Sequence, residues 1–330
     1  MDWHPTRRSL TAGLLAIGAS PLLPTGAGAA PARPDDDGAA YLLSYFTDAD
    51  EGRAGLKLAA SEDGYVFTPL GNGRGFLVPT VGPDRLMRDP CVAQGPDGLW
   101  HLVWTSGWFN STIGHATSPD LVRWSAQQGI PVMEAFKGVR NTWAPEVIWD
   151  ARARHWVIMW SSSIAGRFGA TAAKGFDGLN SRPYFTTTRD FRSFAPTRLL
   201  FDPGFDAIDF TWVDLGHGRL QLVYKDETHV AGETHRWLVS STAASPTGPF
   251  GPPSPHFTTT MTEGPTGVRM GEGYLVYYDV YEQKHFGGAF TNDFNHWTDM
   301  TAKVRFPEGA RHGTVKRVDP KVIQAIRSAG

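Results

Sequence analysis

The sequence predicts an all-β protein, a five-bladed β-propeller closed by pairing of its N- and C-terminal strands. Three observations predict this fold: alternating runs bounded by turn residues, a recurring turn motif, and a series of residues repeated in step with the turns. The runs are rich in Val, Tyr, Trp and Thr, whereas helical periodicity is almost absent. Examples of such runs are Leu99–Trp104, His155–Trp160, Leu220–Tyr224 and Tyr274–Tyr278.

The turn motif consists of Ser or Thr, any residue, Asp, and an aromatic residue four positions after the Asp. Its copies are Ser61/Asp63/Phe67, Ser118/Asp120/Trp124, Thr188/Asp190/Phe194 and Thr291/Asp293/Trp297, with a looser copy at Ser245–Phe250. Successive aromatic positions are 47 to 70 residues apart. Such a period fits one four-stranded blade with loops of varying length.

The second series consists of acidic residues at the starts of short strands, roughly thirty to forty residues before a turn. These residues are Asp89, Glu146, Asp209 and Glu263, and the fifth position of the series falls at Arg311–Val315. No turn motif follows the fifth position, so the remaining strands of that blade must come from the other end of the chain. We expect three from Tyr41–Phe46, Gly55–Ser61 and Tyr65–Leu70, with His312–Val318 as the innermost fourth. The alternative, a β-sandwich with coincidental turns, does not explain two series in register.

The bulk composition favours a neutral partner. The formal net charge is -2, which gives no basic field for nucleic acid or a membrane surface, and the 12 Trp suit packing on the apolar faces of sugars. We therefore expect a monomer that binds a carbohydrate and neither nucleic acid nor membrane. The single cysteine, Cys91, leaves no intrachain disulfide.

The N-terminus has the features of an export signal. The pair Arg7-Arg8 precedes an apolar stretch, Ala12–Leu23, and the small residues Ala27–Ala29, a pattern typical of the twin-arginine route. The domain prediction is an export signal at 1–29, a flexible lead-in at 30–40, a catalytic propeller at 41–318 and a C-terminal tail at 319–330. We expect an exported protein, periplasmic or extracellular.

Convergence of the acidic series predicts a catalytic site. The first strand of each blade lines the central channel, so carboxylates at the strand starts meet at one end, where their mutual repulsion shifts their pKa values apart. Hydrolysis of a glycosidic bond uses such a set: a protonated acid for the leaving oxygen and a base that activates water. In an inverting enzyme the two carboxyl groups stand roughly 6.5–9.5 Å apart.

The chain resembles glycoside hydrolase family 43, the inverting arabinofuranosidases, xylosidases and arabinanases on five-bladed propellers. The resemblance runs from about Tyr41 to Val318. The matching pieces are Arg88-Asp89-Pro90, Trp143-Ala144-Pro145-Glu146-Val147, Ile208-Asp209 with Trp212-Val213-Asp214, Glu263-Gly264-Pro265 and Arg311-His312-Gly313.

The resemblance implies a role for each of three carboxylates. Asp89 would be the general base, Asp209 the group that tunes and orients the acid, and Glu263 the general acid. Glu263 would then carry a proton near neutral pH, because ionised Asp209 beside it raises its pKa. Asp89 must stay ionised, with Arg88 as a candidate cation. The sequence Asp-Phe-Thr at Asp209 departs from the family's Asp-Pro-Ser, and a structural role for Asp209 stays open.

Further residues are candidates for substrate binding. They are Arg88, Trp108, Trp143, Glu146, Arg311 and His312. We interpret Glu146, which replaces the aspartate common in the family, as a hydroxyl ligand of the terminal sugar or a structural residue, and the two Trp as pocket walls or core. The resemblance implies that His312 binds either a water molecule in the channel or a structural calcium ion. We expect that no metal is required.

The substrate is expected to be a terminal sugar, with α-L-arabinofuranosidase activity on plant-type polysaccharide or oligosaccharide as the first hypothesis. A β-xylosidase or exo-galactosidase of the same fold remains an alternative, as does a non-catalytic carbohydrate-binding propeller. Retaining fructosidases of family 32 also contain Arg-Asp-Pro, but they need Asn-Asp-Pro-Asn and Glu-Cys motifs that this chain lacks.

Overall fold

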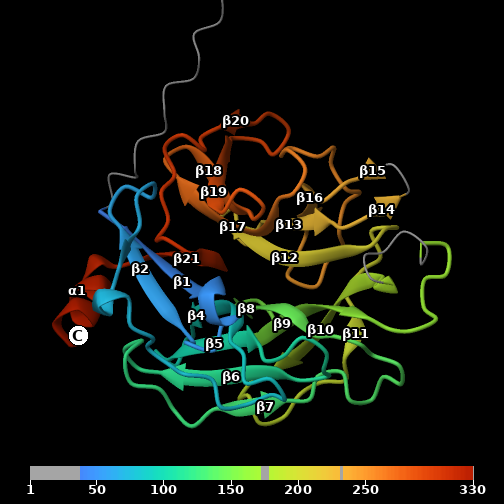
Figure 1. The fold of residues 1–330 in the computed structure, drawn as a ribbon, viewed down its shortest axis with the longest axis horizontal. Coiled ribbons are helices and arrows are strands. Elements are labelled where there is room, and N and C mark those ends of the chain that lie inside the picture. The colour runs from blue at the N-terminus through green and yellow to red at the C-terminus, as the bar shows by residue number, and fades with distance from the viewer. Residues whose placement is uncertain (1–37, 172–177, 231–232, 330) are drawn as a thin grey trace, which may run out of the picture. The chain divides into compact units, whose positions relative to one another are not determined.

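Five antiparallel sheets form the blades of a β-propeller in the computed structural model of the chain (Figure 1). The structure describes residues 38–171, 178–230 and 233–329, all within one compact unit, residues 32–330. The export signal expected at 1–29 and most of the lead-in lie outside the described residues. No helix among the described residues is long and apolar enough to cross a membrane.

The strands follow one another outward in each blade, from the channel to the rim. The first two blades in chain order are β4 (Arg88–Gln94), β5 (Trp100–Thr105), β6 (Ile113–Ser118) and β7 (Gln128–Ile130), then β8 (Trp143–Asp150), β9 (His155–Ser163), β10 (Ser181–Thr188) and β11 (Arg198–Leu199). The next two are β12 (Ala207–Asp214), β13 (Leu220–Asp226) and β16 (Trp237–Ala243), then β17 (Glu263–Met270), β18 (Gly273–Val280), β19 (His285–Thr291) and β20 (Thr298–Asp299). The strands β14 (His229–Val230) and β15 (Glu233–Thr234) form a separate ribbon.

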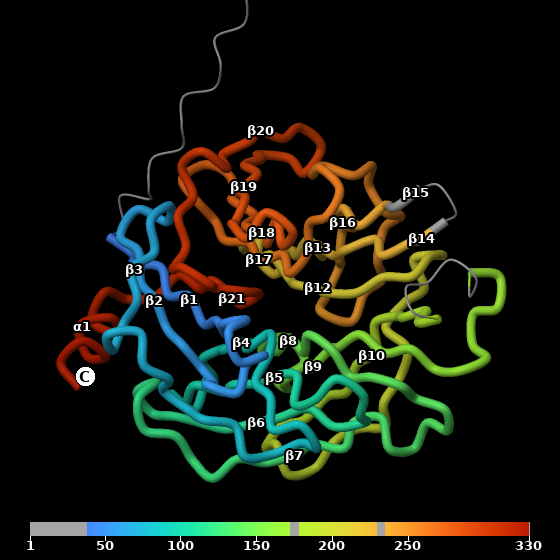
Figure 2. Tube along the Cα trace, in the orientation of Figure 1, coloured from blue at the N-terminus to red at the C-terminus, as the bar shows by residue number. Residues whose placement is uncertain are grey.

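The fifth blade joins the two ends of the sequence, which confirms the predicted closure. Its order is β21 (Ala310–Val318), β1 (Ala40–Thr47), β2 (Lys57–Ser61) and β3 (Thr68–Pro69), with short 3-10 turns at Asp48–Asp50 and Gly71–Gly73. Strand β1 pairs antiparallel with β21, Leu43 facing Val315. Figure 2 shows the blue and red segments side by side. Closure pairs the inner edge that this blade would otherwise expose.

The recurring Asp motif forms a tight turn between the third and fourth strands of four blades. In the copy at Ser118, the Asp120 Oδ1 accepts the N–H groups of Val122 and Arg123, at 3.0 and 2.8 Å, and the Ser118 hydroxyl accepts the Leu121 N–H at 2.7 Å. Leu121 adopts a left-handed φ of 65°. The same arrangement recurs at Asp63, Asp190 and Asp293. The looser copy differs, because the Ser245 hydroxyl donates to the Gly248 carbonyl instead.

The predicted C-terminal tail is a helix. Helix α1 spans Pro320–Ala329, and its Ile323 and Ile326 are buried in a core cluster with Leu42, Val92 and Trp100. Asp319 precedes the helix, where its carboxylate accepts the Lys321 N–H at 2.9 Å. Sequence reasoning missed this helix, although the sequence carries its signal: an acidic cap, then Pro, then apolar residues three positions apart.

Candidate active site

The inner strands of all five blades are bulged at the same end of the channel. In β4, Arg88 faces Thr105 and Cys91 faces Val103, so Asp89 and Pro90 together oppose one residue of β5. Corresponding irregularities occur at Ala144-Pro145, Asp209-Phe210, Gly264-Pro265 and His312. The first residue of four bulges has positive φ: Asp89 at 50°, Ala144 at 47°, Asp209 at 56° and Gly264 at 55°. Such bulges redirect side chains, and strained residues of this kind cluster at functional sites.

The bulges change the register of the predicted acidic series. Asp89, Asp209 and His312 occupy equivalent bulge positions, whereas Glu263 comes one residue before its bulge and Glu146 two residues after the start of its own. Asp89, Asp209 and Glu263 therefore gather at the bulged end of the channel, which we call the mouth. The fourth carboxylate, Glu146, lies farther along its strand.

His312 lies at the centre of the gathered carboxylates. Its Nδ1 is 3.1 Å from Asp89 and 3.8 Å from Asp209, and its Nε2 is 2.8 Å from Glu263. Neither nitrogen is aligned for a directed hydrogen bond with a described residue, so these contacts are ion pairs. Burial alone would lower the pKa of His312, but the charges of Glu263 and Asp209 and the contact with Asp89 raise it well above its usual value. The ring is therefore an imidazolium that holds the cluster together.

Asp89 is held as a carboxylate. The Thr105 hydroxyl donates to it at 2.7 Å. Burial opposes ionisation, but the contact with His312 and the charge of Arg88 lower the pKa of Asp89 below its usual value. The Arg88 guanidinium lies between the rings of Phe46 and Trp108, 4.6 and 4.3 Å from their centroids.

Asp209 retains a proton more readily than the other carboxyl groups of the mouth. It accepts the Gly264 N–H at 3.0 Å. Burial raises its pKa to about 6; His312 and Lys225 oppose the increase, whereas the charges of Glu263 and Asp89 add to it.

Glu263 is surrounded by cations, contrary to the expectation that it is protonated. The Lys225 ammonium lies 2.9 Å from one carboxylate oxygen, and the Arg311 guanidinium donates to the other at 2.9 Å. Burial would raise the pKa of Glu263, but the charges of Lys225 and His312 lower it well below its usual value. In this arrangement the proton therefore favours Asp209 over Glu263, whereas the sequence predicted a protonated Glu263 beside an ionised Asp209.

Sequence reasoning missed two residues that hold this arrangement. Lys225 ends the second strand of its blade and also pairs with Glu227 at 2.6 Å. Asp279, on the second strand of the next blade, accepts from the Arg311 guanidinium and is almost fully buried. A buried strand that ends in charged residues, as Lys225-Asp226-Glu227 does, was the available signal.

Glu146 lines the same small pocket as Asp89, Asp209 and His312. It is 7% exposed, and the Thr314 hydroxyl donates to it at 3.1 Å. Burial raises its pKa, against the nearby charge of Lys316. A void of about 20 Å³ lies between Glu146 and the cluster of Asp89, Asp209 and His312, large enough for one water molecule. Both interpretations of Glu146, a hydroxyl ligand of the sugar and a structural residue, therefore stay predictions.

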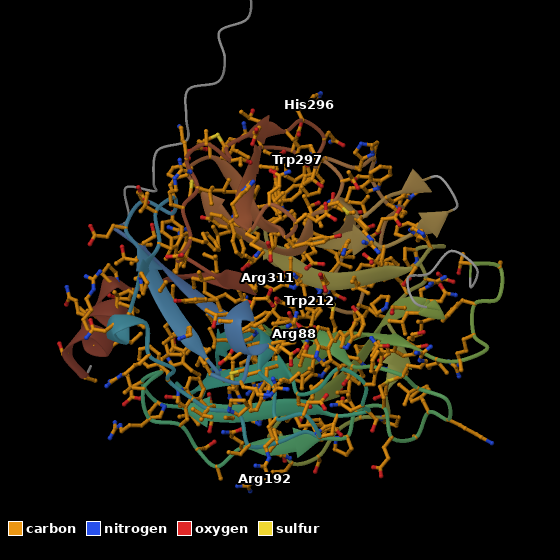
Figure 3. The ribbon with its side chains drawn as sticks, viewed as in Figure 1. Arg88, Arg192, Trp212, His296, Trp297 and Arg311 are labelled. Carbon is orange, nitrogen blue, oxygen red and sulfur yellow. The ribbon has the colours of Figure 1, made fainter. Side chains whose placement is uncertain are left out.

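Aromatic side chains form one wall of the mouth. The Trp143 indole donates to the Trp108 carbonyl at 2.7 Å, and the two rings meet edge to face. Trp108 and Phe109 are 38% and 56% exposed. Figure 3 places Arg88 and Arg311 near the middle of the ring, whereas Arg192, His296 and Trp297 lie toward its periphery. The mouth thus combines an apolar face with fixed charges, as sugar sites do.

The cluster fits calcium poorly. Asp209, Glu263 and His312 offer ligand atoms within 4.8 Å of one another. Calcium takes six to eight oxygen ligands, however, and one of these three atoms is a nitrogen. The ammonium of Lys225 and the guanidinium of Arg311 already neutralise Glu263.

Comparisons with known proteins agree with this geometry. A family model described as a probable glycosyl hydrolase domain, related to glycosyl hydrolase family 43, matches residues 36–321. The α-L-arabinofuranosidase of Bifidobacterium longum subsp. longum is 24% identical over 214 residues, which are 58% of this chain and 20% of that relative. The chain thus spans about a fifth of that protein's length.

Solved structures share the fold. A thermostable family-43 glycoside hydrolase superposes with a TM-score of 0.56 at 17% identity, over 71% of this chain and 80% of that one. A xylan β-1,4-xylosidase from Bacillus halodurans C-125 superposes with a TM-score of 0.51 at 13% identity, over 67% and 42% of the two chains.

Proposed function

Because the chain belongs to the glycosyl hydrolase family 43-related proteins and is thus a glycoside hydrolase, we propose that it releases terminal α-L-arabinofuranosyl groups with inversion at the anomeric carbon. The observation that carries this proposal is the meeting of Asp89, Asp209 and Glu263 around one imidazolium at the channel mouth. The choice of arabinofuranose is supported by the relative named as an α-L-arabinofuranosidase.

The proposed reaction places base and acid on opposite sides of His312. Asp89 takes a proton from water as the water oxygen attacks the anomeric carbon, and Glu263 gives a proton to the glycosidic oxygen as the bond from that carbon breaks. Asp89 contacts one ring nitrogen of His312 and Glu263 the other, which supports a separated pair of carboxyl groups. Asp89 ends with a proton taken from the water, Glu263 ends as a carboxylate with its former proton on the released hydroxyl, and exchange with solvent restores both groups.

The acid role requires a change in the charge on Glu263. Lys225 and Arg311 hold it as a carboxylate in this structure. Under this proposal the hydroxyl groups of the bound sugar take over contacts of these two cations, and the pKa of Glu263 rises. Asp209, whose pKa is raised to about 6, can then release its proton, while Asp89 stays ionised as the base.

A second candidate substrate is a β-xyloside, because a structural neighbour is named as a xylan β-1,4-xylosidase. An exo-galactosidase is a further alternative, since a neighbour with a TM-score of 0.50 is named as a β-1,3-galactosidase.

No step of the proposed reaction uses a metal. We also propose that the protein acts as an exported monomer, on the strength of the Arg7-Arg8 signal and the closed ring.

Substrate and stereochemistry are tested together. We expect release of 4-nitrophenol from the α-L-arabinofuranoside to exceed release from the β-D-xyloside, and proton NMR to show the inverted anomer first. The Glu263→Gln variant should lose about 10²–10⁴-fold in kcat on α-1,5-arabinobiose. The matched control is Glu272→Gln, in the exposed turn after β17, which should retain wild-type activity. Unchanged hydrolysis by Glu263→Gln would exclude Glu263 as the acid.

A further inference from the structure

A second cavity opens at the opposite end of the channel from the mouth. Its volume is about 650 Å³, within the range of roughly 300–1,000 Å³ typical of small-molecule sites. It is lined by the later residues of the inner strands, among them Trp149, Trp212, Asp214, Arg269, Lys316 and Arg317. The catalytic cluster lines a separate void, and the two linings share no residue.

Two cations of this far cavity, Arg269 and Lys316, take part in no ion pair among the described residues. The Arg269 Nε donates to the Gly271 carbonyl at 3.4 Å, and the charge of Lys316 also acts on the buried Glu146. The carboxylates of the lining, Asp214 and Asp319, are exposed, and each accepts one backbone N–H through a single oxygen. The cavity thus offers cationic donors together with free carboxylate acceptors.

Aromatic side chains form its walls. Trp149 is partly exposed and lies against Trp156. Trp212 is 4% exposed, lines the cavity, and its indole N–H has no hydrogen-bond partner among the described residues. In Figure 3 Trp212 lies near the middle of the ring, in line with a place beside the channel. A buried donor without a partner is destabilising, and a ligand oxygen that accepted this N–H would remove the cost.

We propose that the far cavity binds a uronate, a sugar that carries a carboxylate. The partly exposed ring of Trp149 suits the C–H face of a sugar, the Trp212 N–H suits a sugar oxygen, and Arg269 and Lys316 suit the carboxylate. The oxygens of Asp214 and Asp319 that accept no N–H can accept hydrogen bonds from sugar hydroxyls. A simple anion such as inorganic phosphate has few hydroxyl groups to donate, so the two carboxylates favour a uronate. This site is separate from the mouth and independent of the identity of the sugar that is cleaved.

The test compares two monosaccharides that differ at one group, D-galacturonate and D-galactose. Each is titrated into ¹⁵N-labelled wild-type protein while the indole N–H signals are followed by NMR. The Trp212 signal is identified from Trp212→Phe, or by triple-resonance assignment if that variant does not fold. We expect galacturonate to shift the Trp212 signal, with galactose binding at least tenfold more weakly, and the galacturonate affinity to fall at about 0.5 M salt.

Variants locate the carboxylate. Binding of galacturonate should weaken at least tenfold in the double variant Arg269→Gln/Lys316→Gln. The control Arg192→Gln removes a positive charge from an exposed turn elsewhere and should bind as the wild type does. The proposal is overturned if galacturonate leaves the Trp212 signal unmoved, if galactose binds equally well, or if the double variant binds normally. Competitive inhibition of the glycosidase by galacturonate, with no shift at Trp212, would place the ligand at the mouth instead and also overturn it.

Discussion

At the scale of single residues, the charge on Glu263 is controlled by side chains from three blades. Lys225 comes from strand β13 of the third blade, Glu263 itself begins β17 of the fourth, and Arg311 and His312 come from the closing strand β21 of the fifth. Their attraction is strong because all four groups are largely withdrawn from water. Lys225 is therefore a positioning residue that sets the protonation of the proposed acid.

Replacement of Lys225 by Met tests this control. Loss of the cation should raise the pKa of Glu263, so Glu263 keeps its proton to higher pH. The alkaline limb of the profile of kcat/KM against pH should move to higher pH. The control is Lys137→Met, at an exposed position. An alkaline limb at its wild-type position in a folded Lys225→Met variant would contradict the role assigned to Lys225.

Sequence reasoning identified most of the mouth but not its exact register. Asp89, Asp209, Glu263, Arg311 and His312 were all predicted from motifs at strand starts, and the structure brings them together. Lys225 and Asp279 could not be found by the same argument, because both lie at the ends of second strands whose orientation the sequence does not show. Glu146 was aligned with the catalytic residues because a bulge, which adds one residue to a strand, leaves no mark in the strand pattern.

At the scale of elements, the bulge of β17 fixes the relation between two strands. Gly264 has a φ of +55°, and a Cβ added there would lie 2.5 Å from the His312 ring. A side chain at this position would push His312 away from Glu263 and Asp89. Only glycine permits both the backbone conformation and the close approach.

The Gly264→Ala variant should therefore lose activity through displacement of His312. We expect a loss on the order of 10²-fold in kcat/KM, as for other displacements of about 1 Å at catalytic sites. Gly98→Ala is the matched control, since Gly98 also has positive φ, at +79°, but has open space around its Cβ position. Equal activity losses in the two variants would show that backbone strain, rather than contact with His312, is responsible.

Helix α1 contributes stability without contributing to the mouth. Ile326 is 1% exposed in the core cluster that includes Leu42. Ile326→Ala should lower the free energy of unfolding by about 2–5 kcal/mol, the usual cost of such a core truncation. Urea denaturation measures the change, and Gln324→Ala, exposed on the same helix, is the control. A loss below that of the control would mean that the helix is not part of the cooperative core.

At the scale of the whole molecule, stability depends on close contact between blades. His101 and His115, from β5 and β6, are buried against Trp156 and Phe191 of the next blade. Their rings stand 3.2 Å apart at the nearest nitrogens. Burial, together with the neighbouring His101, lowers the pKa of His115 to about 3.

Acid should therefore destabilise this interface. The unfolded chain takes up a proton at His115 near its ordinary pKa of about 6.5, whereas the folded chain resists until about pH 3. The stabilisation is complete above pH 6.5 and declines as the pH falls from 6.5 toward 3, by an amount on the order of a few kcal/mol. Urea unfolding at pH 7.5 and 4.5 should show a smaller difference for His115→Gln than for the wild type. His217→Gln, at an exposed position, should resemble the wild type.

The closing strand also determines when the protein becomes active. Strand β21 supplies His312 and Arg311, yet its partner β1 comes from the other end of the sequence, and the hydrogen bond from the Ser44 hydroxyl to the Thr314 carbonyl joins residues 270 positions apart. While β21 is still inside the ribosome, the nascent chain already contains Asp89, Asp209 and Glu263. It still lacks the His312 imidazolium, whose positive charge offsets their repulsion in the folded protein. Pairing over such a long range is slow, because the entropy of closing the loop must be lost before the contacts form. Under the proposed mechanism, hydrolysis therefore requires that the closing strand has docked and placed His312 and Arg311 beside the carboxylates.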